Sequence, residues 1–288
     1  MLKKKLLRFS LYFLLLVLGA YFILAFSFGG FGKKITVFTT AGKEGEILLF
    51  AHRGLPYYYP ENSIEGLEGA KAHGFIAAEL DIRRSANGTY LIFHDENCKR
   101  LLGLDAEIET LTIDTIKKYS LLASGHKTSA FVPTVDEVLS TEKNSMVFYF
   151  DMKYSSFKDA DEIVALIKKY KCEKSVILTN WDFLFIFYVE TKYPEIITGL
   201  EGLDAGKEWI YELMPKNLKP DFISGFYCQT NEAHINWLKK NDLMNSRIVY
   251  GVDHTNYDAA LKYGFKNLIV DYDEVMRKDP RIINVLKK

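Results

Sequence analysis

The feature of this sequence that most constrains its fold is a regular alternation of short β-branched runs with longer segments of helical period. Eight apolar runs fit β-strands, and a helical pattern separates most of them. This alternation favours parallel strands joined by crossover helices, and eight such strands close into a TIM (β/α)8 barrel. The strand candidates are Ile47–Ala51, Ala77–Ile82, Met146–Asp151, Ser175–Thr179, Ile196–Leu200, Asp221–Gly225, Arg247–Val252 and Asn267–Val270.

The helical segments between these runs support the barrel. An open, doubly wound sheet is the alternative, but no glycine-rich phosphate loop follows the first strand. A further short helix is expected between Leu200 and Pro220. The helix candidates are Ser63–His73, Thr134–Leu139, Asp159–Tyr170, Phe183–Tyr193, Glu232–Lys240 and Tyr257–Tyr263.

One stretch interrupts the alternation. The second strand candidate is followed by RRSANGTYLIFHD, in which Asn87-Gly88 is a strong signal for a hairpin turn. We therefore predict a return strand at Tyr90–Phe93 that leads directly to His94. Residues from about 96 to 132 then form an insertion with a mixed helical pattern, so the barrel is expected to carry a helical insertion after this hairpin.

The N-terminus predicts a membrane helix. A basic cluster precedes an apolar stretch from about Phe9 to Phe28, and roughly 20 residues at about 1.5 Å each span a bilayer core of about 30 Å. We predict that residues 1–32 are a membrane anchor and that residues 33–288 form the barrel. The basic residues are Lys3, Lys4, Lys5 and Arg8.

The basic cluster also predicts the orientation of the chain. It should keep the N-terminus in the cytoplasm and place the barrel on the other side of the membrane. The alternative is a cleaved signal peptide with Ala25-Phe26-Ser27 as the cleavage site, which would leave a secreted or periplasmic barrel.

Composition argues against two functional classes. The 37 basic and 37 acidic residues give a net charge of zero, so no nucleic-acid partner is expected. Cys98, Cys172 and Cys228 lie far apart in the sequence without the spacing of a zinc site, and their odd number does not indicate a disulfide framework. The oligomeric state is not indicated by the sequence.

The first candidate for chemistry is His52-Arg53-Gly54, at the end of the first strand. Functional groups in a TIM barrel gather at the C-terminal ends of the strands. A histidine beside an arginine at such an end suggests acid/base chemistry next to an anion. The alternative is a histidine held by local hydrogen bonds.

Three carboxylates follow on the next two barrel strands. Glu79 and Asp81 lie two residues apart, so both side chains point to the same face of the second strand. Such a pair would repel unless a cation neutralised it, and oxygen ligands suit Mg²⁺ or Ca²⁺. Asp151 adds a third carboxylate, and Lys153 could neutralise a phosphate. A pair of solvated charges at the strand end is the alternative.

His94-Asp95, after the predicted return strand, supplies a second histidine. Two histidines beside a bound metal and two cations, Arg53 and Lys153, point to phosphoryl transfer. The metal and cations would stabilise charge on the phosphoryl oxygens, and the histidines would exchange roles as base and acid.

Together these pieces resemble the glycerophosphodiester phosphodiesterase family, whose pattern is an HRG, a PENT, an ExD, an HD and an ExK in this order. The resemblance extends from Ala51 to about Val275. The matching segments are AHRG (Ala51–Gly54), PENS (Pro60–Ser63), ELDI (Glu79–Ile82), IFHDENCKRLLG (Ile92–Gly103) and FDMK (Phe150–Lys153).

The resemblance implies a role for each of these residues. A catalytic acid/base pair, a divalent-cation site for Ca²⁺ or Mg²⁺, a phosphate-binding pair and a group that shapes the site mouth are expected. The acid/base pair would be His52 and His94, and the cation ligands Glu79, Asp81 and Asp151. Arg53 and Lys153 would bind the phosphate, and Glu61, Asn62 and Trp181 would shape the mouth of the site. A packing role is the alternative for Trp181.

The sequence also departs from the family pattern. Asp151 replaces the usual glutamate, which shortens that ligand by one methylene. The late elements Tyr250–Asp253 and Val270–Asp273 differ from the usual WTVN-like and TDxP-like segments. These changes lie on the side of the site expected to bind substrate.

The resemblance implies hydrolysis of glycerophosphodiesters to sn-glycerol 3-phosphate and an alcohol, by attack of the neighbouring glycerol hydroxyl and opening of a cyclic phosphate by water. One alternative is lysophospholipase D-type or phospholipase-type activity on membrane lipids, with the Tyr57–Tyr59 run contacting acyl chains or packing in its loop. A second alternative, supported by Asp151 and the altered late elements, is a non-catalytic barrel that binds phosphate or a polymer. The leaving alcohol is not indicated.

Overall fold

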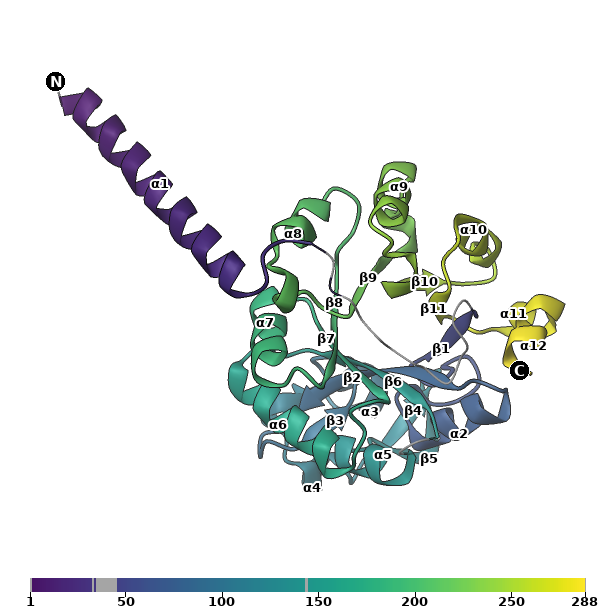
Figure 1. The fold of residues 1–288 in the computed structure, drawn as a ribbon. Helices are drawn as coiled ribbons and strands as arrows, with labels where there is room; N and C mark the ends of the chain where they lie inside the picture. The colour runs from purple at the N-terminus through teal and green to yellow at the C-terminus, as the bar shows by residue number, and fades with distance from the viewer. Residues whose placement is uncertain (1, 33, 35–45, 143–144, 288) are drawn as a thin grey trace.

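The computed structural model describes residues 2–32, 34, 46–142 and 145–287. Within these residues, eight parallel strands pair in a closed ring, because β1 bonds to both β2 and β11 (Figure 1). The TIM barrel and all eight predicted strands are therefore confirmed. In ring order the strands are β1 (Leu48–His52), β2 (Ala77–Arg84), β6 (Val147–Met152), β7 (Val176–Asn180), β8 (Ile197–Leu200), β9 (Phe222–Phe226), β10 (Arg247–Val252) and β11 (Asn267–Val270).

The helices surround this ring (Figure 1). Their apolar faces pack inward; in α6, for example, Ile163, Val164 and Ile167 are buried while Lys158 and Lys169 lie outside. The predicted helices are present as α2 (Ile64–Ala72), α5 (Val135–Glu142), α6 (Phe157–Lys169), α7 (Phe183–Lys192), α8 (Glu208–Leu213), α9 (Glu232–Lys240) and α10 (Tyr257–Tyr263).

Further short helices were not predicted, and all but α12 have five residues or fewer, too few to show a helical period. The two C-terminal helices, α11 and α12, each begin at an aspartate whose side chain accepts hydrogen bonds from backbone amides of the first turn of the helix. Asp273 caps α11, and Asp279 caps α12. These helices are α11 (Glu274–Lys278), α12 (Pro280–Leu286), η2 (Lys216–Leu218), η3 (Tyr227–Gln229) and η4 (Met244–Ser246).

The core has two layers. Side chains that point into the barrel, such as Phe50, Tyr149 and Ile248, pack against one another across its interior. Side chains that point outward, such as Leu80 and Phe148, pack beneath the helices. Because both faces of each strand are buried, the barrel strands appear in the sequence as continuous apolar runs.

The insertion after β2 is only partly helical. As predicted, β2 turns at Asn87-Gly88 into an antiparallel strand, β3 (Tyr90–Ile92), and Phe93 N extends the pairing by donating to Asp81 O at 2.9 Å. The insertion contains α3 (Lys99–Leu102), η1 (Ile108–Thr110) and α4 (Ile113–Ile116) over a small core of its own.

The same insertion ends in an unpredicted hairpin of β4 (Ser120–Ala123) and β5 (His126–Phe131). Ser124 and Gly125 make its turn with φ of 50° and 80°. The description of a helical insertion was therefore incomplete. Most β5 side chains are exposed, so this strand lacks the apolar alternation that identifies strands in a sequence.

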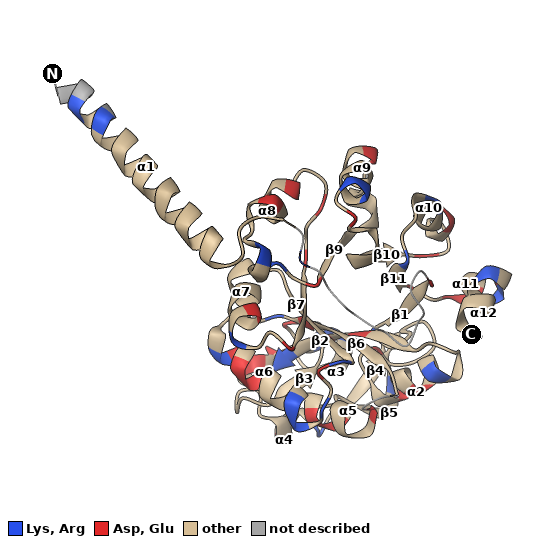
Figure 2. Cartoon of the chain, viewed as in Figure 1, with Lys and Arg blue, Asp and Glu red and all other residues tan. Residues whose placement is uncertain are grey.

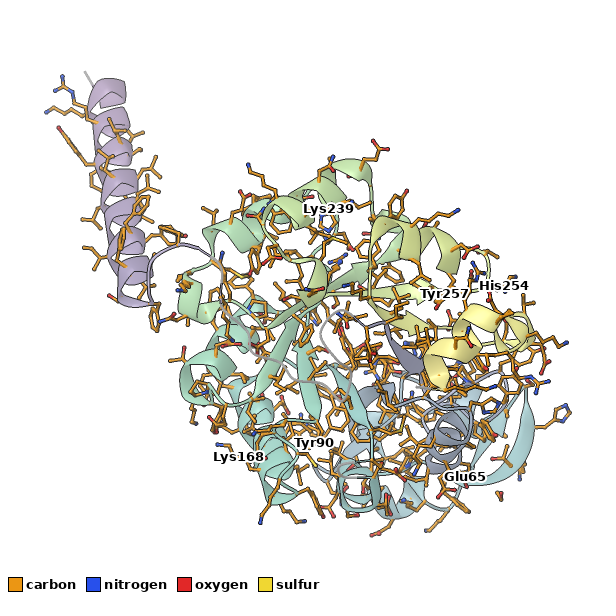
Figure 3. The ribbon with its side chains drawn as sticks, turned by 45° about the vertical axis from the view of Figure 1, so that its right-hand side comes forward. Glu65, Tyr90, Lys168, Lys239, His254 and Tyr257 are labelled. Atoms are coloured by element: carbon orange, nitrogen blue, oxygen red, sulfur yellow. The ribbon has the colours of Figure 1, made fainter. Side chains whose placement is uncertain are left out.

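The N-terminal helix α1 (Leu2–Ser27) is the one described helix that is long and apolar enough to cross a membrane. Its segment Arg8–Ser27 has a mean hydropathy of 2.4 and is almost unburied, and a signal sequence would share these properties. The helix projects away from the barrel beside α7 and α8 (Figure 1), with its side chains standing in open space (Figure 3). The predicted domain boundary follows Gly32, and Lys33 lies outside the described residues.

Candidate active site

The three predicted carboxylates meet at the C-terminal ends of neighbouring strands. Asp81 of β2 stands opposite Asp151 of β6, and Glu79 lies two residues earlier on the same face of β2. One carboxylate oxygen from each of the three lies within 4.8 Å of the others. The strand register therefore assembles the cluster that the sequence predicted.

The carboxylates of the cluster are largely buried, and their negative charges repel one another. Burial and the charge of Asp81 raise the pKa of Glu79 to about 8. Burial alone would also raise the pKa of Asp81, but Lys153 and Arg53 outweigh it and hold that pKa at about 2. Burial raises the pKa of Asp151. A set of oxygen donors under this mutual repulsion fits a hard divalent cation.

Lys153 lies directly against the cluster. Its Nζ is 2.8 Å from Asp81 Oδ1 and also pairs with Asp151. These two carboxylates raise the lysine pKa although burial lowers it, so Lys153 is a fixed positive charge in the site. About a fifth of its side chain remains accessible to a ligand.

The loop after β1 is held in an unusual backbone conformation. Arg53 and Asn62 have positive φ, 49° and 54°, which non-glycine residues adopt at a cost. Hydrogen bonds stabilise this conformation, because Arg53 N donates to Glu79 O at 3.0 Å and Asn62 N donates to Arg53 O at 2.8 Å. Asn62 Nδ2 also donates to Asp81 Oδ2 at 2.9 Å, so the loop is tied to the carboxylate cluster.

The glycine of the HRG segment is required by close packing. Gly54 has φ of 70°, and a Cβ at this position would lie 3.0 Å from the carbonyl carbon of Gly66 in α2. Ser63 begins that helix, accepting a hydrogen bond from Gly66 N at 2.9 Å. Both motif residues therefore set the distance between α2 and the mouth of the site.

His52 lies between two carboxylates. Its Nδ1 is 2.5 Å from Asp271 Oδ1, and its Nε2 is 3.8 Å from Glu79 Oε2. Burial lowers the pKa of His52, but Asp271 and Glu79 together raise it above its ordinary value. The strand order explains the contacts, since β1 lies between β2 and β11.

His94 is held in the same way by its neighbour. Its Nδ1 is 2.7 Å from Asp95 Oδ1. The preceding residue, Phe93, donates its backbone N–H to Asp81 O at 2.9 Å, which places His94 near the cluster. Burial raises the pKa of Asp95, but Arg100 and His94 lower it further than burial raises it.

Arg100, in the insertion, connects the two histidine segments. It donates to Asp95 Oδ1 at 2.7 Å and to Glu61 Oε1 at 2.8 Å. Glu61 in turn accepts from Arg53 Nη1 at 3.2 Å. A continuous series of side-chain contacts therefore connects His94 to Arg53 through Asp95, Arg100 and Glu61. Glu61 contacts both arginines in this series.

The aromatic candidates differ in their surroundings. Trp181 directly follows β7 and is 66% exposed, so it is not a packing residue. In the Tyr57–Tyr59 run, only Tyr57 is strongly exposed. Tyr58 donates to Glu274 at 3.1 Å, and the rings of Tyr58 and Tyr59 pack against His73, so this part of the run packs in its loop.

Sequence reasoning missed Glu201, which follows β8 on the opposite arc of the ring. Its Oε1 accepts hydrogen bonds from Tyr149 and from Thr179, each at 2.8 Å. Burial and the charge of Asp151 raise its pKa to about 8. The position was a usable signal, since Glu201 is an acid at the C-terminal end of a predicted strand. Asp271 carried the same signal, and Arg100 lies within the segment Ile92–Gly103 that resembles the family, although no role was assigned to it.

Comparison with known proteins identifies the family. The profile of the Glycerophosphoryl diester phosphodiesterase family matches residues 52–212. A glycerophosphodiester phosphodiesterase of Caldanaerobacter subterraneus subsp. tengcongensis is 27% identical over 254 residues, which cover 84% of this chain and 98% of that protein. One from Bacillus altitudinis is 25% identical over 164 residues, or 54% of this chain and 67% of that protein.

Solved structures share the fold. The glycerophosphodiester phosphodiesterase from Agrobacterium tumefaciens str. C58 gives a TM-score of 0.67 at 20% identity, over 81% of this chain and 100% of that one. An Oleispira antarctica phosphodiesterase, solved in complex with the product sn-glycerol-3-phosphate, gives a TM-score of 0.67 at 16% identity. The alignment covers 84% of this chain and 97% of that one. Because the family profile matches more than half of its residues, this chain belongs to the Glycerophosphoryl diester phosphodiesterase family and is a phosphoric diester hydrolase.

Proposed function

We propose that this enzyme hydrolyses glycerophosphodiesters to sn-glycerol 3-phosphate and an alcohol, with a divalent cation and two catalytic histidines. The observation that carries the proposal is the arrangement of the histidines. Both are next to the carboxylate cluster, and a carboxylate holds Nδ1 of each, at 2.5 Å for His52 and 2.7 Å for His94. Each histidine therefore keeps Nε2 for proton transfer.

Glu79, Asp81 and Asp151 would hold the cation. When bound, a divalent cation supplies positive charge that polarises the phosphoryl group. The donor set does not distinguish Ca²⁺ from Mg²⁺, because both take carboxylate oxygens.

The other charged and polar residues bind and position the substrate. Lys153, ion-paired but partly accessible, offers its ammonium to a phosphoryl oxygen. Arg53 lies between Asp81 and Glu61 with its guanidinium directed by both, in a position to contact the same phosphate. Asn62 fixes Asp81, and Trp181 borders the mouth of the site.

The two histidines exchange proton roles over two steps. In the first, one histidine accepts the proton of the glycerol 2-hydroxyl while that oxygen bonds to phosphorus. The other donates a proton to the departing alkoxide, which leaves a cyclic phosphate. In the second step the roles reverse: water attacks phosphorus, the ring oxygen leaves and regains a proton, and sn-glycerol 3-phosphate is released.

We further propose that α1 is a retained anchor with its N-terminus in the cytoplasm, and that residues 33–288 form the catalytic domain on the far side of the membrane. The supporting observations are the length and hydropathy of Arg8–Ser27 and the basic cluster before it. A cleaved signal sequence would place the catalytic domain on the same side.

A panel of glycerophosphodiesters with Ca²⁺ or Mg²⁺ tests the reaction, with release of sn-glycerol 3-phosphate as the readout. A matched pair of substrates, with and without the glycerol 2-hydroxyl, tests the route. The 2-deoxy compound should bind without turning over, and its rapid hydrolysis would instead show direct attack by water. Absence of turnover with every diester and both metals would refute the proposed function.

A further inference from the structure

Two neighbouring outer helices of the barrel expose an apolar surface. On α7, Phe183 and Leu184 are exposed, and on α8 so are Trp209 and Leu213. Trp209 and Leu213 are four residues apart, which places both on one face of α8. We call these four residues the α7–α8 surface.

Other outer helices of the barrel expose at most single large apolar residues, such as Phe157 of α6 and Val275 of α11, among polar ones. The exposed residues of α2 include Glu65 and Glu68, and those of α9 include Lys239. Lys168 of α6 and Lys239 of α9 both lie on the outside of the barrel (Figure 3). By contrast, charged residues of α7 occur only near its C-terminal end (Figure 2). An outer helix that is apolar on its solvent side as well as its core side implies a second apolar environment.

The α7–α8 surface lies beside the attachment of α1 to the barrel. Backbone amides of η2 bond to the segment after α1, with Lys216 N to Gly30 O at 2.7 Å and Asn217 N to Phe28 O at 3.0 Å. The hydroxyl of Tyr21 donates to Leu213 O at the end of α8. Figure 1 shows the same arrangement, with α1 leaving the barrel next to α7 and α8.

The contact between Tyr21 and Leu213 O fixes the position along α1 at which the end of α8 lies. Tyr21 lies inside the apolar segment Arg8–Ser27, roughly 9 Å from its end at about 1.5 Å per residue. Rings of Tyr21, Phe22, Phe26 and Phe31 also gather here, and aromatic residues are typical of the membrane interface. If α1 crosses a bilayer, the end of α8 therefore lies no farther out than the bilayer surface.

We propose that the α7–α8 surface rests on the lipid bilayer that α1 enters, and that it guides substrate carried by that bilayer to the active site. This inference rests on the proposed retained anchor and on the proposed reaction. Trp181 links the two regions, since it directly follows β7 at the end of the barrel that carries the site, and Phe183 comes two residues later. The substrate class is a lipid with a glycerophosphodiester head group and a single acyl chain, as in a lysophospholipid.

Tryptophan quenching tests the membrane contact directly and does not depend on activity. The chain has three tryptophans, so Trp181→Phe and Trp237→Phe leave Trp209 alone in full-length protein in nanodiscs. The matched control adds Val275→Trp to a chain without other tryptophans. Val275 of α11 and Trp209 are both 58% exposed, and α11 lies on the other side of the barrel from α7 (Figure 1).

Lipids labelled near the head group should quench Trp209 roughly twofold more than the tryptophan at position 275, since interfacial residues lie at the head-group level. Equal quenching at the two positions would overturn the proposal. So would mass spectrometry showing that the mature chain lacks α1.

Activity separates this proposal from the proposed reaction. The double variant Phe183→Ser and Leu184→Ser should hydrolyse soluble glycerophosphoethanolamine at the normal rate, which also shows that it is folded. Its rate on lysophosphatidylethanolamine in vesicles should fall roughly tenfold, because apolar area supports binding at the interface. Val275→Ser is the matched control and should change neither rate.

The two proposals fail in different ways. An equal loss on both substrates, or no loss on either, would contradict guidance by the α7–α8 surface while leaving the reaction intact. Lack of activity on both substrates in the unaltered enzyme would contradict the reaction, and the quenching result would still decide the membrane contact.

Discussion

His52 on the first strand of the barrel and Asp271, directly after the last strand, lie 2.5 Å apart between Nδ1 and Oδ1. The contact exists because the ring closes, which brings the two ends of the catalytic domain together. Asp271 thereby fixes the orientation of the imidazole and directs its other nitrogen, Nε2, toward Glu79. The late segment that departs from the family pattern thus supplies a contact to a proposed catalytic histidine.

We predict that Asp271→Asn lowers kcat by roughly 10- to 100-fold, less than the loss of His52 itself, because the histidine remains but its orientation and tautomer are no longer fixed. KM should change little. A matched control is Asp273→Asn, since Asp273 holds His254 Nδ1 at 2.6 Å in a similar pair, and neither residue is among the proposed catalytic residues. Equal effects of the two substitutions would contradict a specific role for Asp271.

Removal of the divalent cation should abolish turnover, because the three carboxylates repel without a positive charge between them. Glu79→Ala and Asp81→Ala should lose nearly all activity and weaken metal binding measured by calorimetry. Glu65→Ala, an exposed acid on α2, is the control. Full activity after exhaustive chelation would defeat this prediction.

Asp151→Glu should be tolerated, since it restores the usual family length at this position. The longer side chain would extend into a site that also holds Glu201, whose pKa the charge of Asp151 already raises. We expect activity near the normal level and metal affinity equal or tighter. A severe loss would show that the site is built for the shorter ligand.

His52→Ala and His94→Ala should each reduce the rate by at least about 10²-fold, the lower end of general acid/base catalysis. Metal binding should persist in both variants. If the two histidines serve one proton cycle, the double variant should be little slower than either single variant, because groups that act as a unit are non-additive. Multiplicative losses in single-turnover measurements would show that they act independently.

Deletion of residues 1–32 should give a soluble, folded and active barrel, whereas the full chain should sediment with membranes and resist extraction by salt. The deletion removes the bonds of Phe28 and Gly30 to η2, which hold only the surface of the barrel. Circular dichroism and turnover of a soluble diester provide the readouts. Recovery of unprocessed full-length chain in the soluble fraction would contradict the anchor.

Lys219 is expected to destabilise the fold at neutral pH. It is 3% exposed, and burial lowers its pKa from 10.5 to about 8. Below pH 8 the lysine is charged in both the folded and unfolded chain, so the folded state bears the full penalty, on the order of 3 kcal/mol. Between about pH 8 and 10.5 only the unfolded chain keeps the proton, so stability from this group rises with pH.

Lys219→Met should therefore stabilise the protein at pH 7, and the gain should disappear as the pH approaches 10.5. The loss of the cation–π contact with Tyr211 reduces the gain somewhat. Denaturant titrations at pH 7 and pH 10 measure the effect, with Lys240→Met on the exposed side of α9 as the control. A gain that does not depend on pH would point to packing rather than to charge.

The sequence by itself determined the barrel and most of the proposed catalytic set. Strands buried on both faces must be continuous apolar runs, and the helices between them must be amphipathic, so the alternation is visible along the chain. A residue that follows such a run must lie at the C-terminal edge of the sheet. That rule alone located His52, Asp81 and Asp151 next to one another.

Only the tertiary structure decided which distant residues complete the site. The partners of His52 and Glu61 are Asp271 and Arg100, which lie 219 and 39 positions away in the sequence. Closure of the ring and the packing of the insertion bring them into contact, and neither leaves a local pattern. The attachment of α1 to α8 is likewise decided in space, since a hydrogen bond from Tyr21 to a main-chain oxygen does not depend on the side chain of Leu213.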